Sequence, residues 1–179
     1  MKNSLLFLGA FFLCLGFSSC TEEDVKGLVP AFDVDLVKIE TIPVHVDQTD
    51  GEWVTYSYTT DLNIVNSDTE DYLNKIKQVK VNNLSYKIIN FNGDPNGQVE
   101  GSFSFANQVS MNNSFMVQTA AQNGTVYQVN DVGELNRMAN ALKSGQNVMV
   151  ECSGNAICND GPMDFTIEVT LNVKVTIDP

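Results

Sequence analysis

The sequence predicts an all-β protein folded as an antiparallel sandwich, and three observations support this prediction. Apolar and polar residues alternate along several segments, turns rich in Gly and Asn separate these segments, and a single clear helical pattern lies between the late ones. Strands with one buried and one wet face bury their apolar sides by stacking as two sheets, so this pattern predicts one sandwich core.

The first segment has the features of an export signal. Lys2 precedes an apolar run over residues 5–17, which is too short to cross a bilayer as a helix and has the length of a signal-peptide core. We therefore expect residues 1–19 to be removed, residues 20–31 to form a tether and residues 32–179 to fold as a single domain.

A cysteine closes this apolar run. The stretch LGFSSC at residues 15–20 resembles a bacterial lipobox, which implies that Cys20 is acylated and becomes the new N-terminus. Cleavage by an ordinary signal peptidase after Ser18 or Cys20 would instead give a plain secreted protein. Acyl chains contribute about 0.8 kcal/mol per buried methylene, so a lipidated Cys20 would anchor the chain to a lipid bilayer without a transmembrane segment.

Three acidic residues follow Cys20 after a single threonine. The stretch Cys20-Thr21-Glu22-Glu23-Asp24 resembles the export signal of surface lipoproteins in the Bacteroidota. The resemblance implies an outer-membrane lipoprotein that faces the cell exterior. The alternative is a solvated acidic tether on a lipoprotein that faces the periplasm.

The charge of the chain argues against nucleic-acid partners. The formal net charge is −12, and no cluster of Lys or Arg offsets it. Because like charges repel, we expect neither nucleic acid nor an anionic lipid surface to bind this protein.

The body of the chain alternates in the manner of strands. Residues 165–177 alternate apolar and polar side chains without a break, as only a half-buried strand requires. Shorter patterns of the same kind occupy residues 34–46, 54–64, 79–89, 99–105, 115–117 and 148–152. The alternation slips at Asn82-Asn83, where a bulge would keep both halves of the strand facing the core.

Turn chemistry separates these strands. Asp50-Gly51 is a two-residue hairpin signal, residues 92–97 form a longer turn, and residues 159–162 precede the last strand. About seven strands at this spacing favour an immunoglobulin/fibronectin-like β-sandwich with one helix between late strands, and a closed barrel is the alternative.

One helix interrupts the strands. Asp131 and Glu134 have the spacing of a capping box, and Gly145 provides a stop. The apolar face consists of Leu135, Met138, Ala139 and Leu142. We expect this face to cover an open end of the sandwich, and we expect a weaker helical turn at residues 67–73, where Ser67 and Glu70 repeat the capping spacing.

Cys152 and Cys158 remain as an even pair once Cys14 leaves with the signal and Cys20 carries lipid. In an oxidising compartment such a pair is expected to form a disulfide. The loop between them is short, so the expected role is to fix a local turn, and the spacing lacks the Cys-x-x-Cys pattern of redox-active pairs.

Catalytic constellations are nearly absent from the sequence. His45 is the single histidine and lies in a strand-like run, so we interpret it as a solvated strand residue. Carboxylate pairs for glycoside hydrolysis could come from Glu100, Glu151 or Glu168, but nothing in the sequence places two of them together. We therefore expect the protein not to be an enzyme.

One turn partly matches a calcium loop. Asn92, Asp94 and Asn96 offer oxygen ligands at alternate positions before Gly97, but Phe103 stands where the bidentate Glu is required. A hairpin connection explains the same residues without an ion, so we expect no metal and no cofactor and keep these three as weak candidate ligands.

What remains is binding or assembly. Small β-sandwich lipoproteins that this chain resembles include accessory subunits of outer-membrane complexes and glycan-binding proteins. Tyr56 and Tyr58 share a face with Val54 and are expected in the core, which leaves Trp53 alone on the other face. This favours an accessory subunit with an outer-membrane protein partner, and the alternative is a surface module that binds a glycan or calcium.

Overall fold

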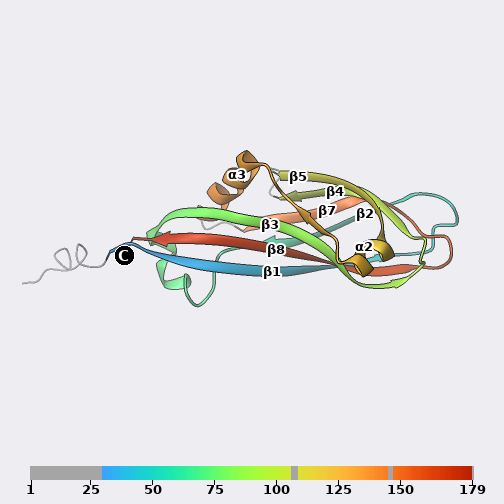
Figure 1. Ribbon diagram of the computed structural model, residues 1–179, viewed down its shortest axis with the longest axis horizontal. Coiled ribbons are helices and arrows are strands. Elements are labelled where there is room, and N and C mark those ends of the chain that lie inside the picture. The colour runs from blue at the N-terminus through green and yellow to red at the C-terminus, as the bar shows by residue number, and fades with distance from the viewer. Residues whose placement is uncertain (1–29, 106–108, 145–146, 179) are drawn as a thin grey trace, which may run out of the picture.

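The computed structural model describes residues 30–105, 109–144 and 147–178. Its strands form two separate four-stranded sheets, and every ladder is antiparallel. Figure 1 shows an elongated molecule in which the long strands run along the long axis. The predicted all-β antiparallel sandwich is therefore confirmed, and the strands do not close into one barrel.

The first sheet has the order β1-β8-β3-β6 and the second has the order β2-β7-β4-β5. The strands of the first sheet are β1 (Phe32–Val46), β8 (Met163–Ile177), β3 (Ile76–Gly93) and β6 (Val126–Gln128). Those of the second are β2 (Val54–Leu62), β7 (Val148–Ile157), β4 (Gln98–Phe105) and β5 (Val109–Met116).

This order corrects the topology that we expected. In the immunoglobulin fold one sheet contains strands A, B, E and D and the other contains strands C, F and G. The first strand therefore does not pair with the last. Here the first strand, at the edge of one sheet, pairs with the last strand, and most connections cross from one sheet to the other. Eight strands wound in this way form a jelly roll, so the immunoglobulin-like assignment is not confirmed.

The central strands carry the predicted alternation into the core. β8 buries every second side chain from Met163 to Ile177 and pairs with β1 on one side and with β3 on the other. The ladder between β3 and β8 shifts register between Val81 and Asn83, which confirms the bulge expected there. Because of this shift both Val81 and Leu84 face the core.

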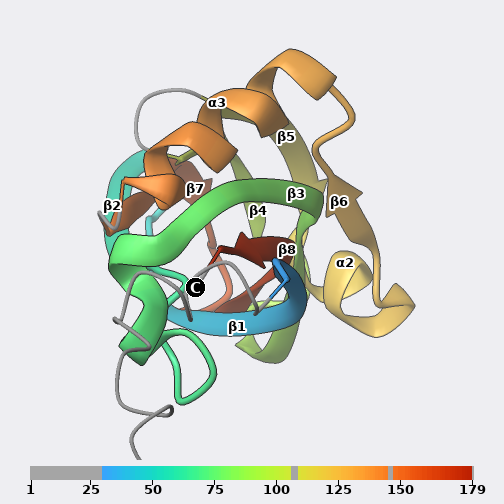
Figure 2. The ribbon, with the colours of Figure 1, turned by 90° about the vertical axis from the view of Figure 1, so that its left-hand side faces the viewer.

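Helices and a short strand close one side of the sandwich. Figure 2 shows α3 (Val132–Lys143), β6 and α2 (Val117–Asn123) following one another around the side formed by β3 and β5. The predicted helix is confirmed, and its cap is formed by the N–H of Glu134, which donates to Asp131 Oδ1 over 2.9 Å. Met138, Ala139 and Leu142 are its buried residues.

Three local predictions need correction. Val117, expected to end a strand, begins the unpredicted helix α2. The helical turn expected at residues 67–73 is a 3-10 helix, η1 (Glu70–Lys75), that begins after Thr69 without a side-chain cap. Asp50 and Gly51 do form a tight turn with φ of 50° and 94°, but the strands that they join belong to opposite sheets, so they make no hairpin.

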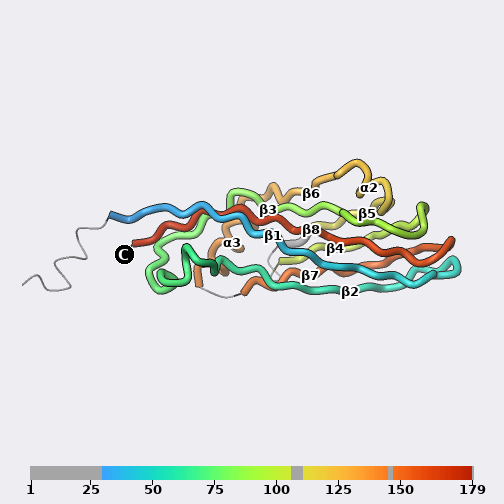
Figure 3. Tube along the Cα trace, turned by 90° about the horizontal axis from the view of Figure 1, so that it is seen from below, coloured from blue at the N-terminus to red at the C-terminus, as the bar shows by residue number. Residues whose placement is uncertain are grey.

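The two ends of the sandwich differ. Phe32 pairs with Ile177, so the start of β1 and the end of β8 lie together at one end, as the tube in Figure 3 shows. The connections at residues 47–53, 94–97 and 158–162 gather at the opposite end, which we call the distal tip. In the part of the chain that the structure describes, none of the helices is long and apolar enough to span a membrane.

Candidate functional site

The side of the sandwich opposite the helices is formed by the edge strands β1 and β2, which belong to different sheets. An edge strand directs the N–H and C=O groups of alternate residues away from its ladder, so it can pair with another chain unless it is protected. These two edges differ in how they are protected.

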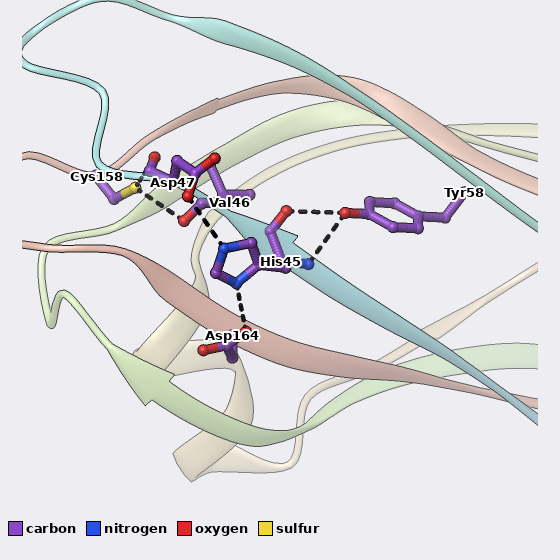
Figure 4. A network of polar contacts seen from close by, with 6 residues as sticks. All are labelled: His45, Val46, Asp47, Tyr58, Cys158 and Asp164. Carbon is purple, nitrogen blue, oxygen red and sulfur yellow. Dashed lines mark hydrogen bonds and ion pairs between the residues drawn. The ribbon is translucent and has the colours of Figure 1, made fainter.

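The distal part of β1 has no free N–H group to offer at two successive edge positions. Figure 4 shows the Tyr58 hydroxyl beside the backbone of His45. The His45 N–H donates to Tyr58 Oη over 3.2 Å, and Tyr58 Oη donates to the His45 carbonyl oxygen over 2.8 Å. These groups therefore point away from β8, and so does the backbone of Pro43 two residues earlier, which has no N–H.

A charged side chain protects the middle of β1. Lys38 belongs to the alternate set that faces the second sheet, and its Nζ donates to the carbonyl oxygen of Val65 over 3.0 Å. An inward-pointing lysine and a proline are two of the devices by which natural sheets prevent edge pairing. The edge of β1 is thus protected by its own sequence.

β2 carries neither proline nor lysine. Its sequence, VTYSYTTDL, is rich in Val, Thr and Tyr, which favour strands, and its main neighbours are β7 in the sheet and β1 across the open side. A groove of about 440 Å³ lies between the two edges, lined by residues 45–48 and 54–58. Trp53 and Val54 are 45% and 37% exposed at its distal end. β2 therefore offers backbone groups along an open groove.

The surroundings of this groove are acidic. From residue 39 to residue 74 the sequence contains no Lys or Arg. Asp61 lies within β2, and Asp47, Asp50 and Glu52 lie in the connection that leads into it. The side chain of Asp47 is 96% exposed, so it contributes its charge to solvent at the mouth of the groove. The groove is therefore complementary to a basic segment.

His45 lies on the outer face of β1 between two carboxylates. Its Nδ1 is 2.7 Å from Asp164 Oδ1 and its Nε2 is 3.2 Å from Asp47 Oδ1. The hydrogen bond with Asp164, followed by that with Asp47, raises the pKa of His45 above its ordinary value. Because the carboxylates contact opposite nitrogens of the ring, they do not converge on one point, and among the described residues no group of three or more His, Cys, Asp or Glu side chains is placed to hold a metal ion.

The candidate carboxylates are not brought together. Glu100 and Glu151 share the outer face of the second sheet, but Glu151 pairs with Ser104, four residues along β4 from Glu100. At about 3.3 Å per residue this separates the two by about 13 Å along the strand. That exceeds the separation of about 5–9.5 Å in glycosidases. Glu168 lies in the other sheet, where its Oε1 is 2.7 Å from Lys87 Nζ.

The residues of the weak calcium candidate have structural contacts. Asp94 is buried at the distal tip, where its Oδ1 accepts the N–H of Asn96 over 2.8 Å. Its Oδ2 accepts the N–H groups of Asn159 and Asp160 over 2.7 and 3.1 Å. Burial alone would raise the pKa of Asp94, but these N–H groups outweigh it and leave the pKa below its usual value. Asn92 lies within β3 opposite Asp164, so Asp94 joins two loops and the three residues do not outline an ion site.

The expected disulfide between Cys152 and Cys158 is wrong for this structure, because both are free and buried thiols. The chain from Cys152 through the end of β7 is extended, so six residues separate the two cysteines by about 20 Å. A disulfide requires Cα atoms within about 7 Å. Burial raises the pKa of Cys152 to about 12, and Cys158 Sγ donates to the carbonyl oxygen of Asp47 over 3.2 Å.

The remaining predicted residues divide into two groups. Tyr56 and Tyr58 pack partly buried against the core, as expected, while Trp53 is exposed. Cys20, Glu22, Glu23 and Asp24 lie outside the described residues. Pro43 was not among the expected site residues, although a proline within a strand-like run indicates an edge strand.

Comparisons with known proteins identify no relative. No family model matches the chain, and no curated protein matches it. Among solved structures, the decameric BFDV capsid protein aligns with 7% identity and a TM-score of 0.41, over 80% of this chain and 99% of that one. The 60-mer BFDV capsid protein gives 8% identity and a TM-score of 0.44 over 83% and 96%, and Desmodium yellow mottle tymovirus gives 11% and 0.32 over 79% and 89%. No functional inference rests on similarities at this level.

Proposed function

We propose that this chain is a non-catalytic outer-membrane lipoprotein of the Bacteroidota type that binds a partner protein by strand addition to the edge of β2. In strand addition, backbone hydrogen bonds supply affinity and side-chain pockets along the edge supply specificity. The proposed role is that of an accessory subunit in an outer-membrane complex.

The contrast between the two edges on one side of the sandwich is the observation that carries the proposal. β1 combines Pro43, the occupied backbone of His45 and the inward-pointing Lys38, whereas β2 has none of these protections. An unprotected edge of nine residues would promote aggregation unless a partner covers it. This favours a native partner for β2.

The chemistry of the groove defines that partner. An extended segment with Lys or Arg would pair with the backbone of β2 and lie beside Asp47, whose side chain is exposed. The exposed Trp53 and Val54 would contact apolar side chains at the distal end of the same segment. The proposed partner is therefore a basic, extended segment of an outer-membrane protein.

The proposed anchor fits this arrangement. Acylation of Cys20 would attach the tether to the end of the sandwich where β1 begins, and the eleven residues from Thr21 to Ala31 reach at most about 40 Å. The distal tip and the groove would then point away from the membrane that holds the lipid (Figure 3). The proposed location is the cell surface, because of the acids at Glu22, Glu23 and Asp24.

Position-specific crosslinking in the native membrane tests strand addition. A photo-crosslinking amino acid replaces Thr59 on β2 in one version of the full chain and Thr41 on β1 in a matched version, since both side chains are exposed. We expect a single crosslinked outer-membrane protein from position 59 and none from position 41, with the crosslink mapping to a segment that contains Lys or Arg. Equal crosslinking from both positions, or none from position 59, would contradict the proposal.

Fractionation tests the anchor independently. Cys20→Ala should release the chain from the membrane fraction, and protease treatment of intact cells should degrade the wild-type chain if it faces the exterior. Full membrane retention of the Cys20→Ala variant would refute lipidation, and protection from protease would place the chain on the periplasmic face.

A further inference from the structure

A shallow trough crosses the outer face of the second sheet, away from the edge of β2. It has a volume of about 540 Å³ and is lined by three consecutive residues from each of β4, β5 and β7. This volume lies within the range of about 300–1,000 Å³ of small-molecule sites. The trough is open to solvent, so a ligand would reach it without movement of the chain.

The ladders arrange the polar side chains of the trough in two parallel rows. Glu100 pairs with Asn155 on β7 and with Ser114 on β5, which gives the first row. Ser102 pairs with Ser153 on β7 and with Asn112 on β5, which gives the second. Side chains two residues apart on one strand lie on one face about 7 Å apart, so the rows face each other across a gap.

A pair of glycines forms the floor between the rows. Gly101 and Gly154 face each other in the ladder between β4 and β7. A Cβ on Gly101 would lie 2.4 Å from the Ser153 carbonyl oxygen, and one on Gly154 would lie 2.2 Å from the Glu100 carbonyl oxygen. Only glycine permits this close approach of the two backbones. The floor is therefore main chain, bordered by hydroxyl, amide and carboxylate groups.

The residues of the trough select one class of ligand. The lining contains no Lys, Arg or His to bind an anion and no hydrocarbon side chain to bind an apolar molecule. It contains one carboxylate, Glu100, whereas a divalent cation such as calcium takes six to eight oxygen ligands, several of them charged. Ser hydroxyls and Asn amides both donate and accept hydrogen bonds, as the hydroxyl groups of a sugar do.

We propose that the trough binds a neutral, hydroxyl-rich ligand, an oligosaccharide, between the row of Glu100 and the row of Ser102. Glu100 Oε1 already accepts a hydrogen bond from Asn155 Nδ2 over 3.3 Å, so its carboxylate is held at the border of the trough. From there it accepts hydrogen bonds from sugar hydroxyls, and hydrogen bonds to a charged acceptor are the stronger kind. Binding on the face of the sheet is separate from strand addition at its edge.

An array of neutral oligosaccharides tests this site. The probes are glucans, mannans, xylans and galactans, and the protein is the labelled full chain in a detergent without a sugar headgroup. Ser102→Leu places a bulky apolar side chain in the trough, and Thr170→Leu places the same side chain on the outer face of the other sheet as a control. We expect wild type and Thr170→Leu to bind at least one probe and Ser102→Leu to bind it at least tenfold more weakly.

Two further variants separate the possible explanations. Glu100→Gln keeps the shape of the side chain and removes its charge, so it should weaken binding even if Ser102→Leu fails to fold. Thr59→Lys on the edge of β2 should leave oligosaccharide binding unchanged and should weaken binding of the protein partner. Absence of wild-type binding to every neutral probe, or wild-type affinity in Ser102→Leu and Glu100→Gln, would overturn the proposal.

Discussion

The two edges on the open side of the sandwich flank the same tight turn yet have opposite properties. β1 contains a proline, an inward-pointing lysine and a backbone occupied by the Tyr58 hydroxyl, whereas β2 alternates Thr, Ser and Tyr with no such protection. Both edges are built by one short chain in the same solvent, so solubility alone does not explain why one is protected and the other is open. We propose that the edge of β2 is kept open for pairing with a partner.

Matched lysine substitutions should show the largest difference between the edges. Thr59→Lys adds a bulky cation to β2, which hinders pairing and repels a basic partner, so we expect partner affinity to fall at least tenfold, about 1.4 kcal/mol. Thr41→Lys adds the same charge to β1 and should leave affinity unchanged. Both affinities can be measured by titrating the purified partner, and equal losses would remove the distinction between the edges.

Removing the Tyr58 hydroxyl should open the distal part of β1. Tyr58→Phe deprives the His45 N–H and carbonyl oxygen of their partner, so we expect the free energy of unfolding to fall by about 1 kcal/mol. Ser57→Ala, on the outer face of the same strand, should change it by less than about 0.5 kcal/mol. Urea unfolding of both variants provides the measurement, and equal stabilities would mean that the Tyr58 contact contributes nothing to closing β1.

Restoring the missing N–H should make β1 resemble β2. Pro43→Thr returns an N–H donor to the free edge of β1. When the partner covers β2, we therefore expect this variant to self-associate with rising concentration and wild type not to do so. The free energy of unfolding should change by less than about 1 kcal/mol. Pro95→Thr, in the exposed loop after β3, serves as the control. Sedimentation velocity measures the association. If Pro43→Thr adds no self-association at any concentration, Pro43 does not protect the edge of β1 from pairing.

The smallest expected effect concerns pH. The hydrogen bond with Asp164 raises the folded-state pKa of His45, so its contribution to stability is fully present below 6.5, the ordinary pKa, and is lost as pH rises through the folded-state pKa. Between about pH 5 and about pH 8 the melting temperature of wild type should therefore fall relative to that of His45→Gln. A constant difference between the two proteins would show that the imidazolium does not hold the end of β1 to β8.

The elements of the fold were largely predictable, and their order in space was not. The alternation of residues 165–177, the slip at Asn82-Asn83 and the cap at Asp131 are local patterns, and each matches the structure. Which strands become neighbours depends on long-range packing that alternation does not encode, so the immunoglobulin-like order was not confirmed. The predicted disulfide was wrong for a related reason. An even number of cysteines does not reveal whether the chain between them is extended.

The candidate site was predictable only in part. Tyr56 and Tyr58 were correctly expected to face inward and Trp53 outward, but the role of the Tyr58 hydroxyl requires His45 from a different sheet. Pro43 was the available signal for an edge strand. The trough depends on the register of three strands, which places Gly101 beside Gly154 across 53 residues of sequence, and no local pattern reveals that pairing.

Amide hydrogen exchange of the full chain, alone and bound to the partner captured from position 59, tests directly whether a partner strand adds to β2. Free edge amides exchange quickly, and amides in a new ladder become protected. We expect partner binding to protect alternate amides of β2 between Val54 and Leu62 and to leave those of β1 unchanged. Protection confined to β1 or to the distal tip, with β2 unchanged, would contradict it.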